Sequence, residues 1–307
     1  MTHLAIQTEG LTKVYKGDFW KKGVVGLEDL NLEVEEGEVY AFLGPNGAGK
    51  TTTIKLLTRL LFPTRGNVWI LGQRNTARSS MENVGYLPEQ PSMYGYLSGG
   101  EFLDFIARIF GMALNTRKKR IPELLRKVGL GGRGDLPIRS YSRGMVQRLG
   151  LAQAIINDPR LVILDEPMAS LDPVGRKDFR DLIFELKNRG KTIFFSSHIL
   201  SDAEMVADRV GILNDGRLVS VGKLDELVSS QIASVEVTFI LEPEKLSKID
   251  LGTEDAVVRD QKVMVRLKKE EAVPDFLNLV AQSGGTVVSV IPQRKSLEDI
   301  FMAEVRG

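Results

Sequence analysis

The chain has 307 residues, of which 43% are hydrophobic and 26% charged, a composition typical of a globular protein with about two domains. Its formal net charge of +1 does not favour a nucleic-acid partner bound through bulk electrostatics. The absence of cysteine excludes disulfides and thiolate metal sites, and the two histidines, His3 and His198, are too few for a histidine-cluster metal site.

No apolar run approaches the roughly 18–20 residues that a membrane-spanning helix needs. The first ten residues, MTHLAIQTEG, lack the basic segment and apolar core of a secretory signal. We therefore expect a cytoplasmic protein without direct membrane insertion. If it acts at a membrane, it must dock onto a separate membrane-spanning partner.

Residues 1–222 alternate between strand and helix patterns, punctuated by Gly and Pro. Short apolar runs typical of buried strands occupy residues 38–44, 161–167 and 191–197, and residues 65–72 have the pattern of a turn and a strand. Residues 51–62 carry apolar side chains at helical spacing and end before Pro63. Residues 90–157 show helical patterns and no clear strand, so we expect a helical insertion there. Because buried strands separated by helices favour a largely parallel sheet, the region is predicted to be α/β.

The sequence changes character near residue 223. Residues 234–241 alternate apolar and polar side chains, as a half-buried strand does. Two more strand patterns lie at 262–268 and 286–291, and helical patterns lie at 272–284 and 296–305. We therefore expect a small α+β domain over residues 223–307.

A glycine-rich segment, GPNGAGKT at residues 44–51, lies between a predicted strand and a predicted helix. It matches G-x-x-x-x-G-K-[ST], in which glycines let successive N–H groups point inward and the helix N-terminus adds its positive dipole end. Lys50 would place a cation on the β- and γ-phosphates, and the Thr51 hydroxyl would ligate Mg²⁺. The predicted nucleotide-binding residues of this segment are Gly44, Pro45, Asn46, Gly47, Ala48, Gly49, Lys50, Thr51 and Thr52.

Two carboxylates follow the apolar run in LVILDEP at residues 161–167. Asp165 stands where a carboxylate would hold Mg²⁺ through water, and Glu166 would polarise the attacking water. A strand that merely ends in two exposed acids is the alternative, but the phosphate loop in the same chain argues against it. Together the two segments predict a nucleoside-triphosphate site, but GTPases, kinases and motor ATPases all use such a loop, so they do not yet name the function.

The order of a phosphate loop, a helical segment, YSRGMVQRLGLAQAIINDPRLVILDEP, ASLD and SSH resembles the nucleotide-binding domain of the ATP-binding-cassette (ABC) family. In that family a signature segment opens a helix that runs toward the second acidic strand. Ser142 lies 23 residues before Asp165, whereas Ser98, in the letters LSGGE, lies 67 residues before it. The signature residues are therefore predicted to be Ser142, Arg143, Gly144 and Met145. The resemblance implies that they complete the ATP site of the opposite subunit.

The letters LSGGE instead predict the start of a helix. Ser98 and Glu101 are three residues apart and precede FLDFIARIF, which is the spacing of a capping box. The Ser98 hydroxyl would accept from the backbone N–H of Glu101, and the Glu101 carboxylate would accept from the N–H of Ser98. The apolar side chains that follow lie on one helical stripe.

The resemblance implies roles for further positions. Tyr15 stands where the family stacks an aromatic ring on adenine, with a core or surface tyrosine as the alternative. Gln90 is slightly favoured over Glu89 as the residue that senses Mg²⁺ and the attacking water. Asp172 matches an inter-subunit loop and would also suit a helix N-cap, while His198 matches the histidine that contacts the γ-phosphate.

The resemblance also implies the fold, an α/β P-loop NTPase with a mostly parallel core sheet and an N-terminal antiparallel β subdomain. This ATPase domain would span residues 1–222, with its helical subdomain at about residues 90–157. The small α+β domain of residues 223–307 would be an accessory to it.

The expected protein is the ATP-hydrolysing subunit of an ABC transporter, which uses ATP and Mg²⁺ and pairs with a second copy or a homologous ATPase. A separate ABC membrane permease would hold it on the inner face of the cell membrane. Catalysis is assigned to Lys50, Gln90, Glu166 and His198. Mg²⁺ is assigned to Thr51, Gln90 and Asp165, the last through water.

The tail beyond residue 222 loosely resembles the C-terminal extension of bacterial ABC-2-type exporter ATPases, with SLEDIFM as the closest match. The variants YSRGM and YLPE point the same way, so export is favoured over import. A soluble ABC-type ATPase and a nucleotide-gated regulatory module with low turnover are the alternatives. The single cassette argues against the first, and Glu166 and His198 argue against the second.

Overall fold

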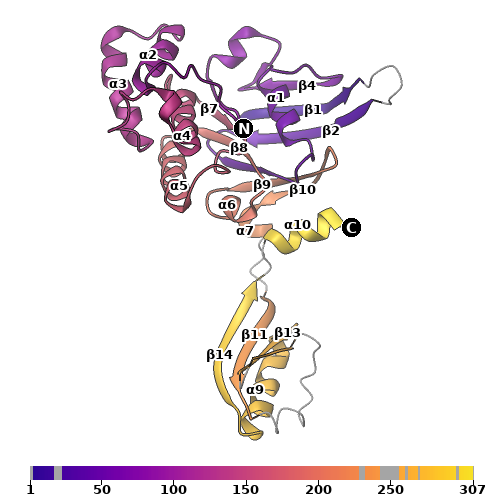
Figure 1. Ribbon diagram of the computed structural model, residues 1–307. Coiled ribbons are helices and arrows are strands. Elements are labelled where there is room, and N and C mark those ends of the chain that lie inside the picture. Colours follow the sequence, from indigo (N-terminus) through magenta and orange to yellow (C-terminus); the bar gives the residue numbers. More distant parts are fainter. Residues whose placement is uncertain are drawn as a thin grey trace. The chain divides into compact units, whose positions relative to one another are not determined.

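The computed structural model describes residues 3–16, 23–227, 232–242, 256–259, 262–268, 270–294 and 297–306. The chain divides into two compact units, one up to Leu224 and one from Asp225 to Arg306, and each is described by itself (Figure 1). The sequence analysis expects the division after residue 222. Among the described residues, no helix combines the length and the apolar character that crossing a membrane requires.

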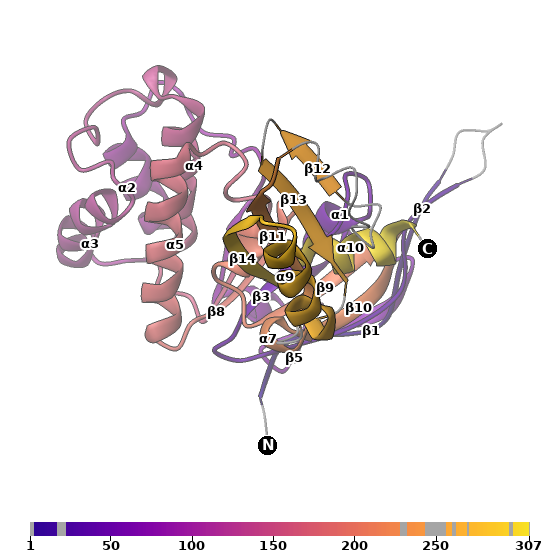
Figure 2. The same cartoon turned by 90° about the horizontal axis from the view of Figure 1, so that it is seen from below.

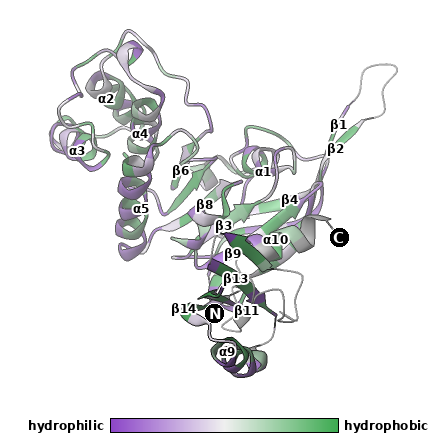
Figure 3. Cartoon of the chain, turned by 60° about the horizontal axis from the view of Figure 1, so that its bottom comes forward, coloured by the Kyte–Doolittle hydropathy of each residue, from purple (hydrophilic) through white to green (hydrophobic). Residues whose placement is uncertain are grey.

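The first unit is organised around a six-stranded sheet in the order β10-β9-β3-β8-β7-β6. Its strands are β3 (Val39–Leu43), β6 (Val84–Leu87), β7 (Leu161–Leu164), β8 (Thr192–Ser197), β9 (Arg209–Asn214) and β10 (Arg217–Lys223). All neighbours pair in parallel except β9 and β10. Every residue of β3, β7 and β8 is buried, as parallel strands covered on both faces require. The predicted largely parallel sheet is confirmed, and β3 and β6 carry the green of hydrophobic residues in Figure 3.

An antiparallel sheet of the same unit has the order β2-β1-β4-β5. Its strands are β1 (Leu4–Tyr15), β2 (Val24–Glu35), β4 (Arg65–Ile70) and β5 (Gln73–Arg74). Ile6 and Leu30 of this sheet share one hydrophobic core with Phe42 of β3 and with Ile54 of helix α1 (Lys50–Leu57). Helix α1 is thus anchored by core packing to both sheets.

Helix α1 ends at Leu57, whereas the sequence predicts that it continues to residue 62. The reason is Arg59, which adopts a positive φ of 59° that a right-handed helix cannot accommodate. Thr58 is the C-cap of the helix, and its N–H is the last to donate to the carbonyl oxygens of the preceding turn.

The larger helices of the first unit gather on one side of it, as Figure 2 shows. They are α2 (Gly99–Ile109), α3 (Leu114–Lys127), α4 (Arg143–Ala154) and α5 (Pro173–Asn188). A shorter helix of this unit is α6 (Leu200–Glu204), whereas α7 (Leu224–Leu227) begins at the last residue of this unit and continues into the second. A Cβ on Gly85 of β6 would lie 1.9 Å from the carbonyl oxygen of Ala154. Only glycine therefore lets the end of α4 lie directly against the sheet.

The second unit is an antiparallel sheet in the order β12-β13-β11-β14. Its elements are β11 (Ile232–Ile240), β12 (Ala256–Arg259), β13 (Lys262–Leu267), α9 (Val273–Gln282), β14 (Thr286–Arg294) and α10 (Leu297–Arg306). Inward side chains such as Val237 and Val265 pack against Val280 of α9. The rings of Phe239 and Phe276 meet edge to face, with centroids 5.8 Å apart. This core explains the alternating pattern of β11.

Candidate nucleotide site

The loop between β3 and α1 is built on positions that only glycine can occupy. Gly47 and Gly49 have φ angles of 84° and 108°, in the left-handed region that favours glycine. A Cβ on Gly49 would lie 2.5 Å from the carbonyl oxygen of Gly26, and one on Gly44 would lie 2.4 Å from that of Leu213. The loop is therefore pressed against neighbouring backbone in a shape that larger residues would disrupt.

Lys50, the first residue of α1, is 6% exposed. Its Nζ donates to the carbonyl oxygens of Gly44 at 2.7 Å and Pro45 at 3.2 Å. The same nitrogen lies 3.3 Å from Oε1 of Glu166. Because charges interact more strongly in surroundings of low dielectric constant, a cation held here attracts a polyanion into the loop.

Asp165 directly follows β7 and is 1% exposed. The parallel pairing of Leu164 with Phe195 brings the next residues, Asp165 and Ser196, together at the carboxyl ends of β7 and β8. Ser196 Oγ donates to Asp165 Oδ1 at 2.7 Å, and Thr51 Oγ1 donates to the same oxygen at 3.3 Å. Burial, the largest influence, raises the pKa of Asp165, and these two hydrogen bonds oppose the rise.

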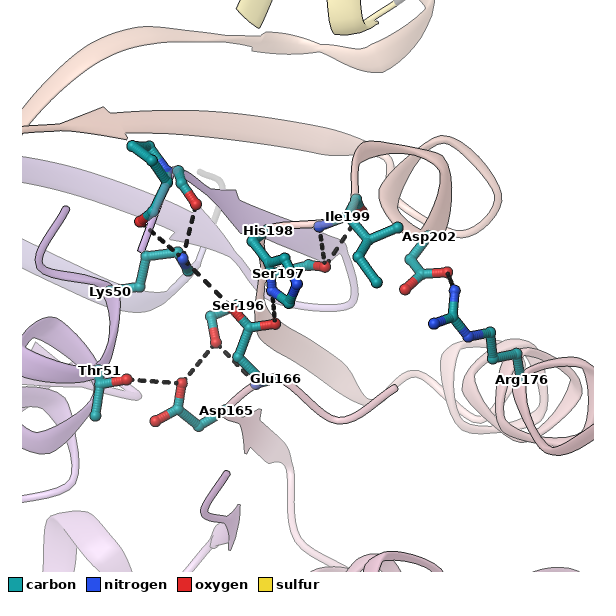
Figure 4. A network of polar contacts seen from close by, with 12 residues as sticks. Lys50, Thr51, Asp165, Glu166, Arg176, Ser196, Ser197, His198, Ile199 and Asp202 are labelled. Atoms are coloured by element: carbon teal, nitrogen blue, oxygen red, sulfur yellow. Dashed lines mark hydrogen bonds and ion pairs between the residues drawn. The ribbon is translucent and has the colours of Figure 1, made fainter. Parts of the chain in front are cut away.

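Glu166 has a positive φ of 47°, which is rare for a residue with a side chain. Its N–H donates to Ser196 Oγ at 2.9 Å, which helps to hold this conformation. The turn directs the carboxylate between two groups, with Oε1 on Lys50 and Oε2 2.8 Å from His198 Nδ1 (Figure 4). Lys50, Glu166 and His198, predicted separately, therefore form one connected network.

Ser196 is a residue of this network that the sequence analysis did not single out. It is fully buried and uses one hydroxyl to orient both acidic residues, as Figure 4 shows. In the sequence, Ser196 is the first serine of SSH, a polar residue near the end of an apolar strand. Its contact with Asp165 depends on the pairing of β7 with β8, which the sequence alone does not give.

Lys50, Glu166 and His198 line a cleft of about 540 Å³. The predicted residues that line it are Tyr15, Asn46, Gly47, Gly49, Lys50, Thr51, Thr52, Glu166 and His198. Gly44, Pro45, Ala48 and Asp165 do not line it. The Tyr15 hydroxyl lies 3.0 Å from Thr52 Oγ1, and the tyrosine is 39% exposed at the mouth of the cleft. Its ring is therefore accessible beside the loop.

The segment after β6 places Glu89, and not Gln90, on the cleft wall. Both residues are exposed, but the slight preference of the sequence analysis for Gln90 has no counterpart among the lining residues. Both residues lie in a bend that follows β6, and only Glu89 is directed into the cleft. The geometry favours Glu89.

The predicted signature residues lie in a second cleft of about 560 Å³. Ser142, Arg143, Gly144 and Met145 line it together with Asp172. Ser142 is the N-cap of α4, and its Oγ accepts from the N–H of Met145 at 3.3 Å. Asp172 is the N-cap of α5 and accepts from the N–H of Gly175 at 2.7 Å. Within one chain, the two groups of predicted residues therefore line different clefts.

The letters LSGGE form the capping box that the spacing predicts. Ser98 is the N-cap of α2, and its Oγ accepts from the N–H of Glu101 at 3.2 Å. The Glu101 carboxylate accepts in return from the N–H of Ser98 at 2.8 Å. Neither residue lines either cleft described above. The helix-starting interpretation is confirmed.

We expect Ser98→Ala to lower the free energy of unfolding by about 0.5–2 kcal/mol, because the first turn of α2 loses its cap. Turnover of nucleotide by the folded variant should match that of the wild type, since Ser98 is outside both clefts. Urea unfolding and steady-state phosphate release provide the two measurements. A large loss of turnover without a loss of stability would reopen the assignment of LSGGE.

The oxygen atoms beside the loop fit a small hard cation that is bound jointly with phosphate. Thr51 and Asp165 supply a hydroxyl and a carboxylate, both suitable ligands for Mg²⁺. In the described part of the chain, no group of three or more acidic or imidazole side chains is arranged so that it could hold a metal ion by itself.

Comparison with known proteins adds a second line of evidence. A model of the ABC transporter family matches residues 27–169. An uncharacterized ABC transporter ATP-binding protein of Nostoc sp. is 42% identical over 312 residues, covering 99% of this chain and 91% of the relative. The bacitracin transport ATP-binding protein BcrA of Bacillus licheniformis is 36% identical, covering 98% of this chain and 97% of BcrA.

The solved structures give the same result for the first unit. The dimeric post-hydrolysis state of an ATP-binding cassette bound to ADP and phosphate superposes with a TM-score of 0.67. It is 25% identical in sequence and covers 72% of this chain and 99% of that cassette. The likeness therefore extends to the whole of a cassette.

Proposed function

This chain belongs to the family of ABC transporter ATP-binding proteins, and from that premise we propose that it powers a separate membrane permease that exports its substrate. The family accounts for binding and hydrolysis of ATP. The observation that carries the assignment of residues is the connected network of Lys50, Glu166 and His198 in one cleft, with Ser142 in another.

In the first cleft the triphosphate lies on the inward N–H groups of the phosphate loop. Tyr15 stacks on the adenine, and the Lys50 ammonium contacts the β- and γ-phosphates. Thr51 and, through water, Asp165 would hold Mg²⁺, which would neutralise charge on the same phosphates. The fixed glycine conformations support this role, because the loop needs little rearrangement to receive the anion.

Hydrolysis is an in-line attack of water on the γ-phosphorus. A new P–O bond forms as the bond to the β-phosphate oxygen breaks, and ADP leaves with the electron pair. Glu166 accepts the proton of the attacking water. Lys50 and His198 stabilise the charge on the transferred group. The 2.8 Å contact between His198 and Glu166 supports the placement of both residues beside the γ-phosphate.

The second cleft receives the γ-phosphate of ATP bound to the partner subunit. Ser142 and Gly144 offer a hydroxyl and a helix N-terminus, and Arg143 adds a cation where the family signature has glycine. Asp172 lies at the same surface. Two copies, or one copy and a homologous ATPase, thus enclose each nucleotide from both sides, so ATP stabilises the pair and hydrolysis releases it.

Glu89 is the residue that we assign to the Mg²⁺ and attacking-water position. We expect Glu89→Ala to lower Mg²⁺-dependent turnover by about 10- to 100-fold and to raise the Mg²⁺ concentration that half-saturates the reaction. Gln90→Ala should stay within about twofold of wild type, as a surface substitution does. Steady-state turnover across a Mg²⁺ titration tests both variants. The reverse ranking would return the role to Gln90.

The permease is proposed to contact an exposed aromatic surface formed by Tyr94, Tyr96 and Phe105. These side chains are 51%, 74% and 41% exposed and line a groove of about 730 Å³. Contiguous exposed apolar side chains commonly mark an interface. The short segment from Glu89 to Tyr94 joins this groove to the nucleotide cleft, so a nucleotide-dependent movement can reach the permease directly.

Export is proposed because BcrA is named for transport of bacitracin, and the ATP-binding protein SrtF of Streptococcus pyogenes for transport of a lantibiotic. The location is the inner face of the cell membrane, through the permease. The second unit, from Asp225 to Arg306, is proposed as an accessory domain. It is covered by the alignment with BcrA, which extends over 98% of this chain.

The test is ATP turnover by the purified chain, alone and after co-expression with its neighbouring membrane protein. Turnover that depends on ATP and Mg²⁺ and changes when the membrane protein is present would support the proposal. Unchanged turnover with every membrane partner would favour a soluble ABC-type ATPase. Binding of ATP without turnover would favour a regulatory module.

A further inference from the structure

Asp202 is a buried carboxylate that the proposed reaction does not use. It lies on α6, is 4% exposed, and its Oδ1 accepts from Nη1 of Arg176 at 3.3 Å (Figure 4). Its Oδ2 is buried without a hydrogen-bond partner among the described residues. A buried carboxylate oxygen without a donor is costly, so this position calls for an explanation.

Arg176 connects Asp202 to the wall of the second cleft. It lies on the first turn of α5, and its Nε donates to the carbonyl oxygen of Leu171 at 3.4 Å. Leu171 and Asp172 line that cleft beside Ser142. One guanidinium therefore holds both the cleft-lining loop and the buried carboxylate, a task suited to the rigid fork of arginine.

Asp202 in turn belongs to the segment that carries His198. The N–H of Asp202 donates to the carbonyl oxygen of Ile199 at 3.3 Å. Ser197 Oγ accepts from the N–H of Ile199 at 2.9 Å, which fixes the turn around His198. Burial, the largest influence, raises the pKa of Asp202, the charges of Arg176 and His198 lower it, and Glu166 raises it.

We propose that Arg176 and Asp202 are positioning residues that link the two nucleotide clefts of one subunit, so that the partner's nucleotide in the second cleft sets the orientation of His198 in the first. This inference rests on the proposed function, in which each subunit contributes to both nucleotides. Figure 4 shows the link, which runs from Arg176 through Asp202 to the His198 segment and its contact with Glu166.

The inference requires a second arrangement of the link, in which the Asp202 oxygen that lacks a donor here gains one. In this structure His198 is bound to Glu166, and Asp202 Oδ2 lacks a donor. A shift of the Leu171 carbonyl would move Arg176 and with it α6, which allows Asp202 to gain a donor while His198 leaves Glu166. The freed carboxylate could then accept the proton of the attacking water. Coupling through an element with two discrete arrangements is a physical route for communication between sites.

The experiment uses Arg176→Met, Asp202→Asn and the double variant in the full chain. Each single variant should lower kcat about 10- to 100-fold through misplacement of His198, with KM for ATP changed by less than about twofold. The Hill coefficient should fall from about 2 toward 1, because the clefts no longer communicate. The kcat of the double variant should be no lower than that of the slower single variant, because each substitution already breaks the same Arg176–Asp202 contact.

Lys187→Met is the matched control, because Lys187 lies on the same helix and its Nζ is 2.5 Å from Asp208 Oδ1. It removes an ion pair of α5 and leaves the Arg176–Asp202 contact in place, so kcat and the Hill coefficient should be those of the wild type. Thermal melting confirms that all variants fold. Wild-type kcat and cooperativity in Arg176→Met, additive losses in the double variant, or an equal loss in Lys187→Met would overturn the inference. A wild-type chain with neither turnover nor ATP-dependent pairing would instead refute the proposed function itself.

Discussion

Glu166→Gln is expected to lower ATP turnover by about 100- to 10,000-fold, because it removes the group that accepts the proton of the attacking water. The amide keeps the size of the side chain and can still bond to Lys50 and His198, whose atoms lie 3.3 and 2.8 Å from the carboxylate. ATP affinity should therefore be retained. Because hydrolysis is what releases the pair, the variant should accumulate as an ATP-bound dimer.

The measurements are single-turnover phosphate release and sedimentation velocity with and without ATP and Mg²⁺. Glu123→Gln serves as the control, since Glu123 lies on α3 and takes part only in ion pairs with Arg120 and Lys127 in the described structure. Turnover of Glu166→Gln within a few-fold of the control would remove Glu166 from its role. An inactive variant that stays monomeric with ATP would refute release by hydrolysis.

The parts of the site that could be predicted from sequence are those fixed by local chemistry. The phosphate loop is recognisable because glycine is required at Gly47 and Gly49 and because a strand and a helix flank it. The capping box at Ser98 depends on residues three apart and needs no tertiary information. The central strands are recognisable because burial on both faces demands continuous apolar runs, as in β7 and β8.

The parts that could not be predicted depend on contacts between distant segments. Ser196 acquires its role only from the pairing of β8 with β7, which sets it beside Asp165. The choice between Glu89 and Gln90 depends on which neighbour faces the cleft, and in this bend no local pattern fixes that orientation. The link from Arg176 to Asp202 joins residues 26 positions apart on different helices.

Among the secondary-structure elements, too, those that depend on contacts between distant segments were the ones that the sequence did not predict. The edge strand β12 and the long strands β1 and β2 were not identified from the patterns of individual segments. β12 has four residues, of which Val257 and Val258 are half exposed, so it carries little periodic signal. β1 and β2 contain register shifts that interrupt strict alternation between faces. In each case pairing with a neighbouring strand defines the element.

Lys50→Met should weaken ATP binding by about 2–5 kcal/mol, the cost of removing one partner of a buried charge pair. This corresponds to an increase in Kd of about 30- to 5,000-fold. The side chain is 6% exposed, and methionine fills similar space without charge, so the fold should be retained. Equilibrium binding of a fluorescent ATP analogue measures the loss, and unchanged affinity would move the phosphates away from Lys50.

The same variant tests whether two chains share each nucleotide. Ser142→Asp keeps an N-cap on α4, because aspartate caps as well as serine, but it places a negative charge in the second cleft. Each variant alone should be inactive. A mixed pair contains one doubly altered site and one site with Lys50 from one chain and Ser142 from the other. Mixing equal amounts should restore turnover to at most about a quarter of wild type, since half of random pairs are mixed and each has one intact site. Mixtures that remain as inactive as the separate variants would show that Lys50 and Ser142 do not act across a shared interface.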